Sequence, residues 1–277
     1  SIISFWRMYS MTQLLLYLFL PLVAAFSPFV PVGARWTSGL NLVKGPSLES
    51  KPDYENMHGP LGKTSDNLFL QIFRSNMAKA IGFDSKLPLD DYKALIELTA
   101  HLNSFYSDKV QIQQISREIL RSCFPSWMPG WYAILFSRPF PAFSSRMNAW
   151  ATRVAGTWLM GECEINDVEV DGAVIGKMQG LHVQRCRFLE ESGCVSVCIN
   201  SCKLPTEAFF LEEMGLPLTM TPNYETFECQ FSFGLTPTLE QDLEARNTPC
   251  LSRCPTAGSL RRLHSVNQDV EKCKMVG

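Results

Sequence analysis

The sequence predicts an α+β protein in which a helical region precedes a cysteine-rich region of mixed strands and helices. Between residues 57 and 160, apolar residues recur every three or four positions, as on the buried face of a helix. After residue 161, apolar and polar residues alternate in short segments, as in half-buried strands. Eight of the ten cysteines fall in this second region: Cys163, Cys186, Cys194, Cys198, Cys202, Cys229, Cys250 and Cys254.

The first 56 residues are predicted to be a targeting presequence. Leu14 to Ala25 form an apolar run that is too short to span a bilayer but fits the core of a signal peptide. Residues 26–48 contain Arg35 and Lys44 but no acidic residue, which is typical of a transit peptide. A signal plus transit presequence predicts residence in a plastid, in the stroma or peripherally on a plastid membrane. Simple secretion is the alternative.

Four helices are predicted in the helical region, residues 57–160. The first runs from Asp66, placed to cap its start, to Gly82, and the next two cover residues 90–103 and 110–120. A long helix covers residues 142–160. Between them, residues 123–136 combine prolines with Trp127 and Trp131, and we expect this segment to interrupt the helices. Such aromatics pack in a core or loop, or rest at a membrane interface.

The cysteine-rich region, residues 161–256, is predicted to contain strands at 165–170, 181–188 and 227–233. Two short helices are expected between the last two strands. The first carries three cysteines and should end before Pro205, because a residue that precedes proline is disfavoured in the helical conformation. The second should run from Pro205 to Gly215. Residues 257–277 are predicted to be a polar tail.

Composition excludes several classes of function. The net charge is −2 and the basic residues form no cluster, so the sequence shows no basic patch that would bind nucleic acid. The sequence also contains no glycine-rich phosphate loop, nucleophile elbow or dinucleotide fingerprint.

The cysteine spacing is the main chemical signal. Cys194, Cys198 and Cys202 are four residues apart, so a helix would align the three thiols along one stripe. Cys250 and Cys254 repeat the spacing. Thiolates favour iron–sulfur clusters, zinc or cuprous copper. From spacing alone, three interpretations stay open: a metal site, inert core cysteines and disulfides.

The longer sequence pattern around these cysteines narrows the three interpretations. The stretch from Cys186 through the cysteine triplet to Phe210 (CRFLEESGCVSVCINSCKLPTEAFF) resembles the signature of the "dwarf" β-carotene isomerase family, as do residues 214–224, 229–234 and 249–254. The resemblance implies an iron-dependent plastid isomerase that interconverts all-trans and 9-cis β-carotene or a related carotenoid. Glu207 stands where the family pattern leads us to expect Gln. A non-catalytic plastid protein with an iron–sulfur or zinc site is the alternative.

The resemblance and the cysteine pattern together define the candidate site. The cofactor implied is iron, alone or as an iron–sulfur cluster, and no catalytic residue is assigned. The candidate metal ligands are Cys186, Cys194, Cys198, Cys202, Cys229, Cys250 and Cys254. The partner is a carotenoid, whose hydrocarbon chain requires an apolar site with few polar groups. Phe209, Phe210 and Phe231 are the candidate walls of that site, and ordinary core packing is their alternative role. Peripheral membrane contact is a further expectation.

Overall fold

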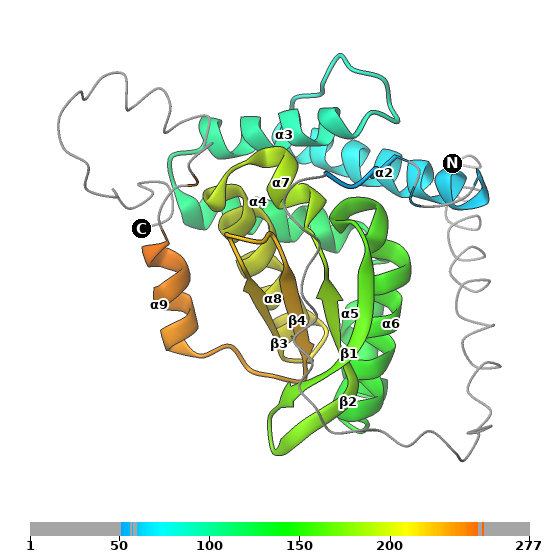
Figure 1. Ribbon diagram of the computed structural model, residues 1–277, viewed down its shortest axis with the longest axis vertical. Coiled ribbons are helices and arrows are strands. Elements are labelled where there is room, and N and C mark those ends of the chain that lie inside the picture. Colours follow the sequence, from blue (N-terminus) through cyan, green and yellow to red (C-terminus); the bar gives the residue numbers. More distant parts are fainter. Residues whose placement is uncertain (1–50, 56, 58–59, 249–250, 252–277) are drawn as a thin grey trace. The chain divides into compact units, whose positions relative to one another are not determined.

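The computed structural model describes residues 51–55, 57, 60–248 and 251, all within one compact unit that begins at Gly45 (Figure 1). Most of the predicted presequence lies outside the described residues. Its last part does not. Lys51 forms an ion pair with Glu191, and the Tyr54 hydroxyl donates a 2.6 Å hydrogen bond to Glu190. Residues 51–55 therefore pack against the cysteine-rich region, while the boundary at residue 56 stays a prediction.

Three amphipathic helices open the fold: α2 (Pro60–Ile81), α3 (Tyr92–Phe105) and α4 (Lys109–Ser122). Asp91 and Asp108 cap α3 and α4 by accepting hydrogen bonds from backbone N–H groups two residues ahead. The predicted cap at Asp66 is wrong, because α2 begins at Pro60 and Asp66 lies inside it. The three helices share one apolar core with α6. The buried residues of this core include Leu95, Leu98, Leu102, Ile112 and Trp158.

The segment predicted to interrupt the helices is itself helical. α5 (Met128–Tyr132) leads into a π-helix, η1 (Ala133–Ser137), and α6 (Pro141–Met160) follows as predicted. Pro129 is compatible with α5 because it lies in the first turn, where a missing N–H costs no helical hydrogen bond. Pro129 therefore marks the start of a helix, whereas Pro125 lies in the turn before it.

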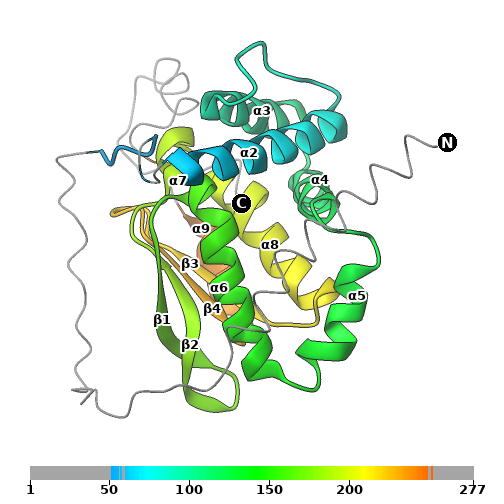
Figure 2. The ribbon, with the colours of Figure 1, turned by 90° about the vertical axis from the view of Figure 1, so that its right-hand side faces the viewer.

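Four antiparallel strands form one sheet: β1 (Cys163–Val170), β2 (Ala173–Val183), β3 (Leu218–Pro222) and β4 (Cys229–Phe233), in the order β1-β2-β4-β3 (Figures 1 and 2). α6 packs along β1, β2 and β4, and α8 packs on β3. β3 was not predicted. The strand predicted over 181–188 ends at Val183, and the residues beyond it turn into a helix.

The second half of the cysteine-rich region is a run of short helical segments. α7 (Arg187–Ser192) is followed by η2 (Val197–Lys203), α8 (Leu204–Ala208) and η3 (Phe209–Glu213). The predicted break before Pro205 is wrong. Leu204 is helical (φ −61°, ψ −42°), and its N–H bonds to the carbonyl of Ile199 five residues back. This π-type turn carries the chain from η2 into α8, so Pro205 occupies the first turn of a new segment.

The described part of the chain ends with α9 (Leu239–Asn247), closed at its start by a capping box between Thr238 and Gln241. Ala245 of α9 packs against Val195, which precedes η2, and Ile199, which lies within η2. The helices described include none with the length and apolar character needed to cross a membrane.

Candidate active site in the cysteine-rich region

Four cysteines meet at one end of the sheet. Cys186 is the N-cap of α7, and Cys198 and Cys202 lie in η2. Cys229 begins β4 and pairs with Val183 at the end of β2. The N–H of Cys186 donates a 2.7 Å hydrogen bond to the carbonyl of Phe227, two residues before Cys229. Strand pairing and this bond thus bring together thiols that the sequence separates by up to 43 residues.

Burial governs the chemistry of these four thiols. Cys186, Cys198 and Cys229 are buried and Cys202 is half-buried, and none forms a disulfide. Burial raises the pKa of Cys186 to about 11, and burial followed by the proximity of Cys186 and Glu207 raises the pKa of Cys202 to about 12. These thiols stay protonated at neutral pH unless a bound cation stabilises the thiolate.

The electrostatic influence of the thiols on one another shows that they lie close together. Burial, and then the charges of Cys202 and Cys186, raises the pKa of Cys198 well above its usual value. Burial, and then the charges of Cys198, Cys186 and Cys202, does the same to the pKa of Cys229. Because the other three thiols all contribute to the shift of Cys229, the four lie within electrostatic range and form one group. We call Cys186, Cys198, Cys202 and Cys229 the thiol group.

Tyr224 faces the thiol group from the turn between β3 and β4. Burial, and then Cys198 and Cys229, raises the pKa of its hydroxyl far above the usual value. The hydroxyl oxygen is buried, and within the described part of the chain its polar neighbour is the Cys198 thiol, with which it interacts without a hydrogen bond of ordinary geometry. Tyr224 therefore belongs to the polar surroundings of the thiol group.

A buried ion pair borders the same group. Lys203 follows Cys202 in η2, and its Nζ lies 2.6 Å from Oε1 of Glu207 in α8. Glu207 also accepts a 2.6 Å hydrogen bond from the backbone N–H of Met220 in β3. Burial raises the pKa of Glu207, although Lys203 acts against this. Sequence reasoning noted Glu207 only as a departure from a family pattern; the signal it missed was a Lys and a Glu four residues apart between buried cysteines and phenylalanines.

The structure only partly assembles the predicted metal ligands. The thiol group contains four of the seven. Cys194 is half-buried and precedes η2, and Cys250 and Cys254 lie outside the described residues. Within 51–55, 57, 60–248 and 251, no three His, Cys, Asp or Glu side chains are arranged to hold one metal ion. The soft donors suit a thiophilic metal, but the described residues alone do not form its coordination sphere.

The predicted substrate walls belong to an aromatic core beside this group. Phe209 is fully buried and stacks on Phe124, with ring centroids 5.4 Å apart. Phe210 packs edge-to-face against both Phe209 and Phe233, and Phe231 lies beside Phe233. The side chains are therefore close-packed with one another, and their role as substrate walls stays a prediction.

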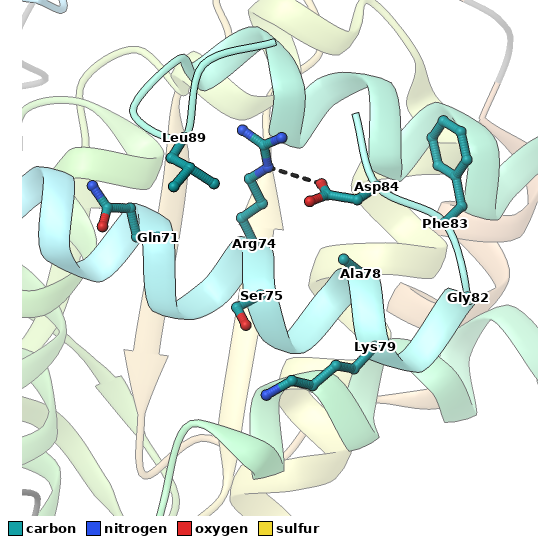
Figure 3. Close-up of a pocket in the computed structure, with 9 residues that line it drawn as sticks. All are labelled: Gln71, Arg74, Ser75, Ala78, Lys79, Gly82, Phe83, Asp84 and Leu89. Carbon is teal, nitrogen blue, oxygen red and sulfur yellow. Dashed lines mark hydrogen bonds and ion pairs between the residues drawn. The ribbon is translucent and has the colours of Figure 1, made fainter. Parts of the chain in front are cut away.

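A hollow elsewhere on the surface has a structural role. It lies between α2 and the loop after it, lined by Gln71, Arg74, Ser75, Ala78, Lys79, Gly82, Phe83, Asp84 and Leu89 (Figure 3). Arg74 crosses it, bonding to Asp84 at 2.9 Å and to the carbonyls of Ser85 and Pro88. The Arg74 guanidinium thus secures the loop, and none of the candidate site residues lines the hollow.

Comparison with known proteins identifies the region that holds the thiol group. Residues 158–242 match the family model described as "Beta-carotene isomerase D27-like, C-terminal". "Beta-carotene isomerase D27, chloroplastic" from Arabidopsis thaliana is 27% identical over 228 residues, which cover 76% of this chain and 84% of the relative. The protein of the same name from Medicago truncatula is 27% identical over 230 residues, covering 77% and 89%. This region of the chain is similar to the D27-like C-terminal domain, and the chain as a whole is similar to these two relatives.

The segment that matches the family model coincides with the site described above. The D27-like segment contains all of the thiol group, the Lys203–Glu207 pair and the three candidate phenylalanines, whereas Cys250 and Cys254 follow it. The similarity to both relatives extends well beyond this segment into the rest of the chain. No solved structure matches this chain.

Proposed function

We propose that this chain is a plastid carotenoid isomerase that interconverts all-trans and 9-cis β-carotene or a related carotenoid. The observation that carries the proposal is the similarity, over about three quarters of the chain, to two proteins named as chloroplastic β-carotene isomerases. The thiol group supports it, because a dense set of buried soft donors falls within the D27-like segment. A purely structural metal protein is not favoured, since both relatives are named as enzymes.

The residues of the site suit a reaction that excludes water. Rotation about one polyene double bond requires a transient loss of bond order, with no hydrolysis and no net oxidation. Phe209, Phe210 and Phe231 are buried apolar side chains that would suit a hydrocarbon, and they lie in the same region as the buried thiols and the Lys203–Glu207 pair. Low polarity strengthens any electrostatic interaction made there.

Iron is the cofactor that we propose, held by Cys198 and Cys202 with help from the other candidate cysteines. Bound iron would supply reversible one-electron exchange, tuned by burial and hydrogen bonds around the sulfurs. The chain's part is to hold the thiols together and to keep water away. Metal analysis of the anaerobically purified full chain, before and after chelation, tests this assignment.

Isomer-exchange assays that start separately from each pure isomer test the function. An isomerase lowers the barrier equally in both directions, so pure all-trans and pure 9-cis substrate should converge on one mixture without oxygen consumption. Chelation should slow the exchange. Cys198→Ala should abolish it, whereas Cys123→Ala, at the end of α4 and outside the D27-like segment, should leave it unchanged. Circular dichroism and Cys198→Ser separate loss of chemistry from loss of fold. Exchange no faster than the heat-only control, with any carotenoid tried, would reject the enzyme.

Plastid residence rests on the predicted presequence and on the relatives' names. Fusion of residues 1–60 to a fluorescent reporter tests it in an alga with a complex plastid. Accumulation of the reporter in the medium would instead establish secretion.

A further inference from the structure

The segment formed by α5, η1 and the turn before α6 exposes a group of large apolar side chains. Trp127, Trp131, Ile134, Leu135 and Phe140 are each 51–60% exposed, although they follow one another within 14 residues. A folded protein seldom leaves so many large apolar side chains in water along one short segment unless they contact a partner. Figure 2 shows α5 at the periphery of the molecule, beside the start of α6. We call these five residues the apolar edge.

The apolar edge is a fixed surface of the fold. Trp127, Trp131, Ile134 and Leu135 recur at helical spacing on one side, while Tyr132 and Ser137 face the interior and are buried.

A buried polar network holds that inner side on α6. The Tyr132 hydroxyl and Ser144 Oγ are 2.8 Å apart, and Asn148 Nδ2 donates to the Tyr132 hydroxyl at 2.8 Å. Ser137 Oγ lies 3.1 Å from Ser144 Oγ. The network anchors η1 and the end of α5, so the exposed side chains are displayed in a constant arrangement.

The chain around the apolar edge carries only positive charge in its own sequence, although Glu212 and Glu213 of η3 lie close by and pair with Arg117 and Arg121. Residues 119–161 contain no Asp or Glu but four arginines, at positions 121, 138, 146 and 153. Arg121 is ion-paired with Glu213, at 3.2 Å. Arg138 and Arg146 are exposed, and neither forms an ion pair within the described part of the chain. Tryptophans beside arginines form the combination that rests in the headgroup region of an anionic bilayer.

We propose that the apolar edge docks the protein peripherally on a lipid bilayer that contains anionic lipid. The aromatic and aliphatic side chains enter the interface, and Arg138 and Arg146 contact the anionic headgroups. A second copy of the chain is the less suitable occupant, because a two-fold contact would set these unpaired arginines against their own copies, and residues 119–161 supply no Asp or Glu to neutralise them. This inference rests on surface geometry and charge and does not require the proposed reaction.

Co-flotation of the full chain with carotenoid-free vesicles tests the proposal. Trp131→Ser/Ile134→Ser/Leu135→Ser removes three members of the apolar edge, and should weaken partition by about tenfold or more. The matched control is Ile175→Ser/Met178→Ser/Leu239→Ser, which changes three equally exposed apolar residues elsewhere and should leave partition within about twofold of the parent. Arg138→Gln/Arg146→Gln should lower the preference for anionic over zwitterionic vesicles by about fivefold per arginine.

All variants share residues 1–50 with the parent, so any difference in partition between them arises from the substituted residues. Equal partition of the parent and the apolar-edge variant would overturn the proposal, since binding would then arise elsewhere in the chain. A parent dimer in analytical ultracentrifugation that the same variant dissociates would assign the surface to a second copy. Thermal melts verify that the variants fold. Exchange of detergent-solubilised carotenoid is read separately, so loss of docking and loss of isomerisation are distinguishable.

Discussion

Lys203 and Glu207 form an ion pair inside the cysteine-rich region, with side chains only 3% and 5% exposed. The pair joins η2, which carries two of the thiols, to β3 through the Met220 N–H. Buried pairs of this kind contribute little over an apolar alternative, but breaking one leaves an uncompensated charge. Its importance here is therefore positional, because it fixes η2 against the sheet.

The first prediction concerns Glu207. Glu207→Ala should lower the free energy of unfolding by about 3–5 kcal/mol, because Lys203 is left buried and unpaired. Glu207→Gln should cost less, since the amide oxygen can still accept bonds from Lys203 and Met220. Urea denaturation measures both. Equal losses for the two variants would show that the charge, and not the hydrogen bonding, holds η2 in place.

A second prediction is an acid-dependent stability contribution from Glu190. Burial by itself would raise the pKa of Glu190, but hydrogen bonds from Arg185 and Tyr54 outweigh it and hold the pKa below its usual value. Such a carboxyl stabilises the fold above the unfolded pKa of about 4.3, and this contribution is lost as pH falls through the lower folded pKa.

Glu190→Gln should therefore be less stable than the parent at neutral pH, and the difference should shrink as the pH falls below about 4.3. Denaturant titrations at a series of pH values measure the difference. Tyr54→Phe, which removes one of the three side-chain hydrogen bonds that Glu190 accepts, should show a smaller effect of the same sign. A difference that does not change with pH would contradict the assignment.

The third prediction separates the two roles of the candidate phenylalanines. Phe209→Ala should lower the free energy of unfolding by about 3–5 kcal/mol, because the ring is fully buried and stacked on Phe124. Phe210→Leu keeps most of the volume and should raise KM with little change in kcat, since it alters contact with the carotenoid. An unchanged KM would assign Phe210 to the core alone.

A fourth prediction concerns the turn from α6 into β1. Gly161 has φ +94°, a conformation that favours glycine, and a Cβ built on it would lie 2.8 Å from the backbone oxygen of Arg185. Gly161→Ala should therefore lower the melting temperature by displacing β1 from the segment that leads to Cys186. Gly130→Ala is the matched control, since a Cβ there meets nothing within 4 Å. A similar fall in melting temperature for Gly161→Ala and Gly130→Ala would exclude a local clash at Gly161 as the cause.

The repeating patterns of the sequence were sufficient for the regular elements. α3, α4 and α6 lie within two residues of their predicted bounds, because each is amphipathic and ends in a turn or cap. Segments that depend on neighbours were predicted less well. The helix through Pro205 and the start of α7 at Arg187 go against local preference. Packing of α8 against α4 and β3, and of α7 against α3 and α6, stabilises them.

By itself, the sequence determined the α+β class, the residue chemistry available to the site and the resemblance to β-carotene isomerases, since these depend on residue types and their order. It did not determine which cysteines meet. Pairing of β4 with β2 sets Cys229 opposite Val183, and the bond from Cys186 to Phe227 closes the group, whereas Cys194 precedes η2 and is only half-buried. Only the tertiary structure decided this, because proximity between distant residues follows from strand register and helix packing, and neither is encoded in local spacing.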